Sequence, residues 1–287
     1  MKLHPRNLFN IVIAMTLTSL PLQTRAGNPV ETKLWPGEPP GMVAGAGPGV
    51  IEPQGKGIHN VGIPGLYVHF PATTGTNRAA IIVCPGGGYH RLWNVTVPNQ
   101  ITGTLVAKDI VVVVLKYRLG PPSAHVQADA LADGRQAMRV VRAHAKEWGI
   151  DPHKVGFIGW SAGANLTLNL ATHNDAGDPA ATDPVARESS RPDYIGLFCP
   201  WPYKDKIAAY PIDAKTPPAF IATARDDTTA PTTFAEAIDA GYKAAGVPAT
   251  FWQIDKGGHT AFSNGATGEG ARWPEHFWPW YAGLKLP

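Results

Sequence analysis

The segment Gly159–Gly163, which reads GWSAG, restricts the fold of this chain more than any other feature. It follows the apolar run 155–158, typical of a buried strand, and it precedes a helical pattern over 161–172. A serine between two small residues at such a junction predicts a sharp, strained turn that lifts its hydroxyl clear of the sheet. Ser161 is therefore the candidate nucleophile. The alternative is a serine that only caps the N-terminus of the helix.

Strands and helices alternate along the rest of the chain. Ala79–Cys84 and Ile110–Leu115 are continuous apolar runs, as expected for strands covered on both faces of a parallel sheet. A long helix is expected around Ser123–Trp148. Further strands are expected at 66–70, 194–199, 219–223 and 250–254, and further helices at 232–245 and 273–284. This order predicts an α/β fold with a mostly parallel, doubly wound sheet flanked by helices.

The chain has 287 residues, which suits one sizeable α/β domain better than two. Residues 1–26 combine a basic start, an apolar stretch and a small residue, Ala26, before a possible cut. This pattern is typical of a signal peptide, so export to the periplasm or the medium is expected. An uncleaved anchor is the alternative, but the apolar stretch is short for a bilayer span.

Residues 27–62 are rich in Gly and Pro and lack a helical or strand period. We expect an extended arm that lies over the domain, with Trp35 and Ile51 as docking residues; the alternative is a disordered linker. The catalytic domain is then expected to span 63–287.

The net charge of the mature chain gives no reason to expect a charged macromolecular partner. The chain has 25 Lys and Arg against 22 Asp and Glu, and residues 1–26 hold Lys2, Arg6 and Arg25 but no acid, which leaves 25 − 3 = 22 bases against 22 acids. Neither nucleic acid nor, after cleavage of the leader, a membrane is expected as a partner. The oligomeric state is not predicted.

Cys84 and Cys199 are the two cysteines of the chain. An even number in an exported protein is compatible with a disulfide. Both residues, however, lie at the ends of predicted buried strands, where a free cysteine packs as a small hydrophobe. Two unpaired, buried thiols are therefore expected.

A glycine-rich loop, Pro85–Tyr89, follows the strand that ends at Cys84. Consecutive glycines let backbone N–H groups approach a developing oxyanion with no Cβ in the way. The N–H groups of Gly87 and Gly88, with that of Ala162, are the candidate oxyanion hole. The alternatives are a tight turn or a phosphate loop, although a phosphate loop would require a Lys-Ser/Thr pair that is absent here.

A serine hydroxyl becomes a good nucleophile when an imidazole takes its proton, and the imidazole needs a carboxylate on its other nitrogen. His259 follows the last predicted strand and is the candidate base. Asp226 and Asp227 follow an earlier buried strand, and either could orient it. The aspartate that does not face His259 is expected to be solvated, capping a turn or pairing with Arg225.

Other candidates for substrate contact flank these segments. Tyr89 and His90 lie beside the glycine-rich loop, and Trp93, Trp160 and Trp201 fall near predicted strand ends, where a site should lie. Packing or surface positions are the alternative for each of them. No His, Cys, Asp or Glu cluster has the spacing of metal ligands, so neither a metal nor a cofactor is expected.

Several segments in order resemble the acetylxylan-esterase-like branch of the α/β-hydrolases, near the hormone-sensitive-lipase and feruloyl-esterase groups. The matching segments are 83–89, 115–119, 133–142, 159–163, 191–194, 226–227 and 257–259. The Asp-x-x-Ala-Pro motif that begins at Asp227 resembles the Asp-x-x-Val-Pro of many such hydrolases, which favours Asp227 over Asp226. The order Ser, Asp, His is also that of this fold.

The chain departs from the family pattern around the cleft. Relatives usually carry an acidic residue with a glycine shortly after the glycine-rich loop, where this chain has the segment 93–98. Asn165 stands where Gly-His is common, and Thr260–Phe262 follows the histidine where glycine is usual. These departures surround the cleft and leave the predicted triad of Ser161, Asp227 and His259 in place. They bear instead on which acyl and alcohol groups the cleft accepts.

The resemblance implies a serine esterase that hydrolyses short-chain acyl esters, above all acetyl esters on plant polysaccharide such as acetylated xylan. A small-molecule or carbohydrate ester is then the expected partner. A general short-chain carboxylesterase or a feruloyl esterase is the alternative; a peptidase or a non-catalytic binding relative is favoured less.

Overall fold

The computed structural model describes residues 29–286 except 54–55, 94, 96–98 and 204–205. The predicted signal peptide, residues 1–26, lies outside the described residues. None of the helices in the described part of the chain is long and apolar enough to cross a membrane.

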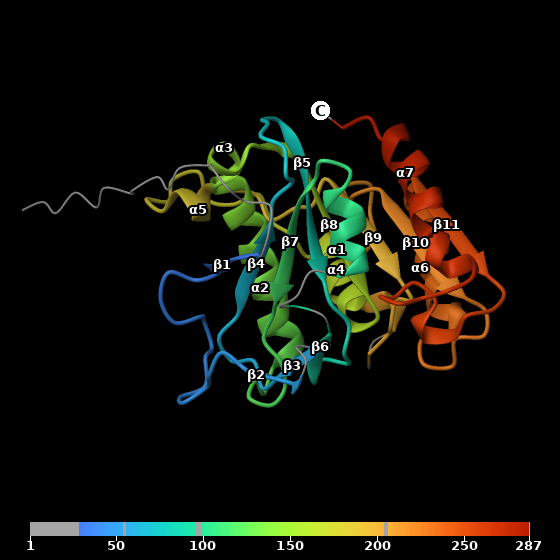
Figure 1. The fold of residues 1–287 in the computed structure, drawn as a ribbon, viewed down its shortest axis with the longest axis horizontal. Helices are drawn as coiled ribbons and strands as arrows, with labels where there is room; N and C mark the ends of the chain where they lie inside the picture. The colour runs from blue at the N-terminus through green and yellow to red at the C-terminus, as the bar shows by residue number, and fades with distance from the viewer. Residues whose placement is uncertain (1–28, 54–55, 94, 96–98, 204–205, 287) are drawn as a thin grey trace, which may run out of the picture.

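One eight-stranded sheet forms the centre of the protein (Figure 1). Its strands, in spatial order, are β1 (Val30–Lys33), β4 (Gly65–His69), β7 (Val111–Lys116), β5 (Arg78–Cys84), β8 (Ile150–Trp160), β9 (Tyr194–Phe198), β10 (Ala219–Ala224) and β11 (Ala249–Ile254). The strands from β7 to β11 are parallel to one another, whereas β4 is antiparallel to β7 and β1 is antiparallel to β4. The predicted mostly parallel sheet is confirmed.

Helices cover both faces of this sheet. They are α1 (Gln100–Val106), α2 (Val126–Ala143), α3 (Ala145–Trp148), α4 (Ala162–Thr172), α5 (Pro184–Arg187), α6 (Thr232–Ala245) and α7 (Trp273–Gly283). Successive residues of a strand point to opposite faces. On β10, Phe220 packs against α7, whereas Ile221 belongs to a buried cluster with α4 and α6. The sheet is therefore doubly wound, with α6 and α7 on opposite faces.

The N-terminal arm contributes more regular structure than its sequence predicts. Strand β1 forms an edge of the main sheet, and β2 (Val50–Ile51) and β3 (Gly57–His59) join β6 (Arg91–Trp93), which lies outside the arm, in a small second sheet. Strands of two to four residues are too short to show a period, so no pattern reveals them. Trp35 docks as predicted, because its Nε1–H donates to Asp133 Oδ1 at 3.0 Å. The prediction for Ile51 is wrong, since that residue is 57% exposed.

The helices also differ from the prediction. The long helix expected at Ser123–Trp148 is divided into α2 and α3 at His144, and neither α1 nor α5 was predicted. Helix α1 has seven residues, too few for a clear helical period, although Asn99 and Thr102 form a capping box at its start.

The prediction for the cysteines is confirmed, because Cys84 and Cys199 are both unpaired and buried.

Candidate active site

Ser161 lies in a strained turn between β8 and α4. Its backbone has φ 54° and ψ −120°, a conformation that few residues other than glycine adopt, and its N–H donates to Phe198 O at 2.9 Å. The flanking glycines are required sterically. A Cβ on Gly159 would lie 2.2 Å from Gly163 O, and a Cβ on Gly163 would lie 2.1 Å from Cys84 O. The local sequence therefore produces the sharp turn that presents the Ser161 hydroxyl.

Three side chains from different loops form one hydrogen-bonded chain. His259 Nε2 lies 2.8 Å from Ser161 Oγ, and His259 Nδ1 lies 2.7 Å from Asp227 Oδ2. Ser161 follows β8, Asp227 follows β10, and His259 lies in the 3₁₀ turn Gly258–Thr260 (η3) after β11. These strands are parallel, so their carboxyl ends meet at one edge of the sheet, where ligands bind in open α/β folds.

The environment of Asp227 keeps it ionised. Burial alone would raise the pKa of its carboxyl. The hydrogen bond with His259 and the backbone N–H groups of Ala230 and Thr229, each 2.8 Å from Oδ1, outweigh burial and hold the pKa below its ordinary value. An ionised, fully buried carboxylate is thus fixed against the imidazole, as stabilisation of an imidazolium requires.

Asp226 has a different surrounding. It is exposed, and its carboxylate accepts the N–H groups of Gly258 at 2.8 Å and Gly257 at 3.2 Å, which lower its pKa. It therefore caps the turn that carries His259. The alternative pairing with Arg225 is wrong, because Arg225 pairs with Asp255.

The loop after β5 has the conformation that an oxyanion hole needs. Gly87 has φ +140°, and a Cβ there would lie 2.1 Å from Arg91 O; Gly88 has φ +62°. Within the described part of the chain, neither glycine N–H donates a hydrogen bond. Ala162 is the first residue of α4, so its N–H has no acceptor within the helix.

A cavity of about 440 Å³ opens over Ser161 and His259. Gly86, Gly87 and Gly88 line it, as do the predicted residues Trp93, Trp160 and Trp201. Trp93 is 43% exposed and Trp201 half-buried, whereas Trp160 is buried and stacks on Phe198 with ring centroids 4.4 Å apart. Trp93 and Trp201 are thus the two tryptophans placed to contact a bulky group.

Two residues predicted to contact substrate do not line this cavity among the described residues. Tyr89 is 1% exposed and turns inward, where its hydroxyl donates to Asn165 Oδ1 at 2.8 Å. His90 is exposed, and its Nδ1 lies 3.2 Å from Gly120 O. Asn165 is fully buried as well, so its departure from the family pattern does not reshape the cavity wall.

Sequence reasoning missed much of the cavity wall. Val83 and Val114 contribute apolar surface from paired positions on β5 and β7, and Ile101 adds a side chain from α1. Asn99, Thr260, Ser263 and Asn264 add polar groups. Two hydrogen bonds join α1 to the loop after His259: Ile101 N–H donates to Asn264 Oδ1 and Gly265 N–H donates to Gln100 Oε1, both at 3.0 Å. The capping box at Asn99 was the one local signal for this wall.

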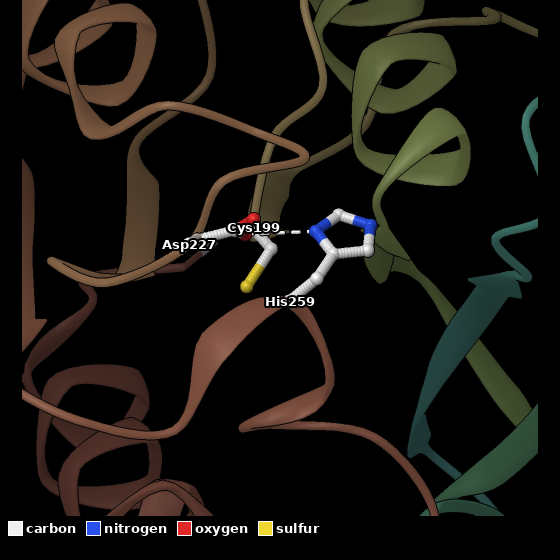
Figure 2. Close-up of side chains that lie close together, drawn as sticks. All are labelled: Cys199, Asp227 and His259. Atoms are coloured by element: carbon white, nitrogen blue, oxygen red, sulfur yellow. Dashed lines mark hydrogen bonds and ion pairs between the residues drawn. The ribbon is translucent and has the colours of Figure 1, made fainter.

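Cys199 lies beside the pair formed by Asp227 and His259 (Figure 2). The potential metal-binding atoms of these three residues all lie within 4.8 Å of one another, a grouping that spacing along the chain did not predict. However, Asp227 and His259 already bond to each other. Burial also raises the pKa of the Cys199 thiol, and the protonated form is a poor metal ligand. The grouping is therefore better explained as an acid–base pair with a neighbouring thiol.

Comparison with solved structures identifies the fold family of this chain. The chain is similar to an acetyl ester-xyloside bifunctional hydrolase from Caldicellulosiruptor lactoaceticus, with 26% identity and a TM-score of 0.71 over 91% of this chain and 97% of that one. It also superposes on an α/β hydrolase from a deep-sea metagenome, with a TM-score of 0.59, over 80% of this chain and 93% of that one, at 20% identity, which bears on the fold alone. The chain has the α/β-hydrolase fold.

Structures of one esterase are also similar to this α/β-hydrolase-fold protein. A propionate-bound esterase from Thermogutta terrifontis has 25% identity and a TM-score of 0.63 over 78% of this chain and 89% of that one. The same esterase phosphorylated by paraoxon matches equally well, over 79% and 92%.

Sequence comparisons cover less of the protein. The BD-FAE family model matches residues 66–192. An acetylxylan esterase from Xylanibacter ruminicola is 37% identical over 93 residues, which are 32% of this chain and 19% of that relative. This chain therefore matches only about a fifth of the relative's length.

Proposed function

We propose that this protein is a serine esterase that hydrolyses short-chain acyl esters, with acetyl esters on plant polysaccharide such as acetylated xylan as its substrates. The observation that carries the proposal is the hydrogen-bonded chain from Ser161 through His259 to the buried Asp227, at the edge of a cavity. Export of the enzyme is part of the same proposal, on the basis of the leader pattern in residues 1–26.

Each group has a defined part in the reaction. Ser161 Oγ attacks the ester carbonyl while His259 Nε2 takes its proton, and Asp227 stabilises the imidazolium. The N–H groups of Gly87, Gly88 and Ala162 bind the oxyanion. His259 then gives the proton to the leaving alcohol, which departs and leaves the acyl group on Ser161. A water molecule, deprotonated by His259, releases the carboxylic acid.

The cavity wall favours a hydroxyl-rich alcohol group. Trp93 and Trp201, which are only partly buried, offer flat apolar faces to the cavity, and the polar side chains of Asn99, Ser263 and Asn264 line it together with Ile101. Aromatic faces combined with hydrogen-bonding groups suit sugar rings. The names of two similar proteins, an acetylxylan esterase and an acetyl ester-xyloside hydrolase, support the same choice.

A substrate panel tests this proposal. We expect turnover of p-nitrophenyl acetate and release of acetate from acetylated xylan, with kcat/KM falling as the acyl chain lengthens. Higher kcat/KM for feruloyl esters, or equal values for simple alkyl and sugar acetates, would favour a feruloyl esterase or a general carboxylesterase instead. No turnover of any ester would support a binding protein and overturn the proposal.

The covalent mechanism predicts inactivation by an organophosphate. Paraoxon should abolish activity and add one diethylphosphoryl group to Ser161, detected by mass spectrometry of the peptide that carries it, because the activated hydroxyl attacks phosphorus as it attacks a carbonyl. EDTA should leave activity unchanged. Loss of activity in EDTA with recovery on adding zinc would contradict the serine mechanism.

A further inference from the structure

Two segments far apart in the sequence supply the N–H groups of the proposed oxyanion hole. Gly87 and Gly88 lie on the loop after β5, whereas Ala162 begins α4. We propose that Asn165, through its hydrogen bond with Tyr89, is a positioning residue that holds this loop at the spacing from α4 that the oxyanion hole requires. The inference rests on the proposed esterase function, because acyl transfer is the reaction that needs such a hole.

Tyr89 is rigidly connected to the glycines that precede it. It follows Gly88 directly and has φ +62°, a left-handed conformation that a bulky residue rarely adopts. Its carbonyl accepts from Gly120 N–H at 3.0 Å, and its buried ring packs edge-on against Tyr117, with centroids 5.8 Å apart. A displacement of the phenol therefore displaces Gly88 and its N–H group.

Asn165 is equally well fixed on the side of the nucleophile. It lies one helical turn after Ser161, and its backbone N–H donates to Ser161 O at 3.0 Å. Its side chain is fully buried. The amide nitrogen donates to Tyr210 Oη at 2.6 Å, which leaves the amide oxygen to accept from the Tyr89 hydroxyl at 2.8 Å.

This bond differs from the others that hold the loop. Some backbone bonds of the loop stay within it and the following strand β6: Gly87 O accepts from the N–H groups of His90 and Arg91, and Gly86 O accepts from Trp93 N–H. Others lead to the segment after β7, where Gly120 N–H donates to Tyr89 O and the Tyr117 hydroxyl donates to Pro85 O. The Tyr89–Asn165 bond instead crosses directly to α4, from which Ala162 also projects its N–H. Oxyanion binding depends on donor distances to a few tenths of an ångström, so a bond that joins the two donor segments sets a catalytic distance.

Tyr89→Phe removes this bond with little change in shape, and Tyr242→Phe is its matched control. Tyr242 is also fully buried, and its hydroxyl donates to Pro217 O at 3.0 Å, away from the cavity. Both variants should show a similar fall in melting temperature. Tyr89→Phe should lower kcat on p-nitrophenyl acetate by about 10- to 100-fold with KM changed by less than about twofold. Tyr242→Phe should keep the wild-type kcat.

The inhibition constant of a trifluoromethyl ketone distinguishes a positioning role from a merely structural one, because a loss of stability alone would not change it. This inhibitor forms a tetrahedral adduct with the serine, so its Ki in Tyr89→Phe should rise by the factor by which kcat/KM falls. Asn165→Leu breaks the same bond and also the bond to Tyr210, so it should lose at least as much kcat as Tyr89→Phe. The double variant should lose no more kcat than Asn165→Leu alone, because Asn165→Leu already breaks the bond that Tyr89→Phe removes.

The outcomes separate this inference from the function on which it rests. A wild-type protein without esterase activity would overturn both. An active wild type with Tyr89→Phe as active as Tyr242→Phe would overturn the inference alone, as would a rise in KM at constant kcat. If Asn165→Leu does not fold, Tyr89→Phe and the inhibitor decide.

Discussion

Ser161→Ala should lower kcat on p-nitrophenyl acetate by about 10⁵- to 10⁶-fold, the size of loss that removal of a triad nucleophile causes. In the proposed mechanism Ser161 Oγ is the atom that becomes acylated, and it is this hydroxyl that lies 2.8 Å from His259 Nε2. Alanine has the same Cβ as serine, so the strained backbone at φ 54° is unchanged and the melting temperature should stay close to that of the wild type. Steady-state kinetics and calorimetry on one preparation check both statements.

His259→Ala should cause a loss of similar size, because the serine and its base act as one unit. His153 is exposed on β8, and His153→Ala is the matched control that should keep full activity. Activity of Ser161→Ala within tenfold of the wild type would contradict the whole mechanism.

Asp227→Asn should lower kcat by about 10³- to 10⁴-fold, as neutralisation of a triad carboxylate does. The buried carboxylate accepts from His259 Nδ1 at 2.7 Å and holds the ring in the tautomer whose Nε2 is free to accept the serine proton. An asparagine amide at this place can donate to Nδ1, which selects the wrong tautomer. The fall should be seen in kcat more than in KM, since Asp227 is not among the described residues that line the cavity.

Asp226→Asn is the matched control on the neighbouring residue. Asp226 is exposed and binds the N–H groups of Gly257 and Gly258, a task that an amide oxygen performs in part. Its kcat should fall by less than about tenfold, through a small shift of the loop that carries His259. If Asp226→Asn lost activity and Asp227→Asn stayed active, the assignment of Asp227 as the triad acid would be wrong, although the esterase proposal would still hold.

The sequence alone predicts the parts of this protein that depend on near neighbours along the chain. Gly159 is needed because a Cβ there would collide with Gly163 O in the same motif, so this part of the GWSAG turn is local; the need for glycine at 163 comes instead from Cys84 O on the neighbouring strand β5. The long helices are predicted because burial of one face imposes a hydrophobic period, and the central strands because burial of both faces imposes a continuous apolar run. Ser161, His259 and the Asp226–Asp227 pair could be singled out because each follows a strand, and the carboxyl ends of parallel strands meet.

The tertiary structure decided what depends on contacts between distant segments. Only the direction of the chain after β10, set by its packing between β9 and β11, puts Asp227 against His259 and turns Asp226 to solvent. Tyr89 is a substrate contact in the sequence-based prediction, but in the structure it is buried, and its hydroxyl donates to Asn165, 76 residues away. Strand β1 and helix α1 are too short to carry a period; β1 depends on backbone hydrogen bonds to β4, and α1 on packing against β7. Local steric conflicts and hydrophobic periods depend on consecutive residues, so they can be recognised in the sequence. Contacts between distant segments depend on burial and hydrogen bonding once the sheet has formed.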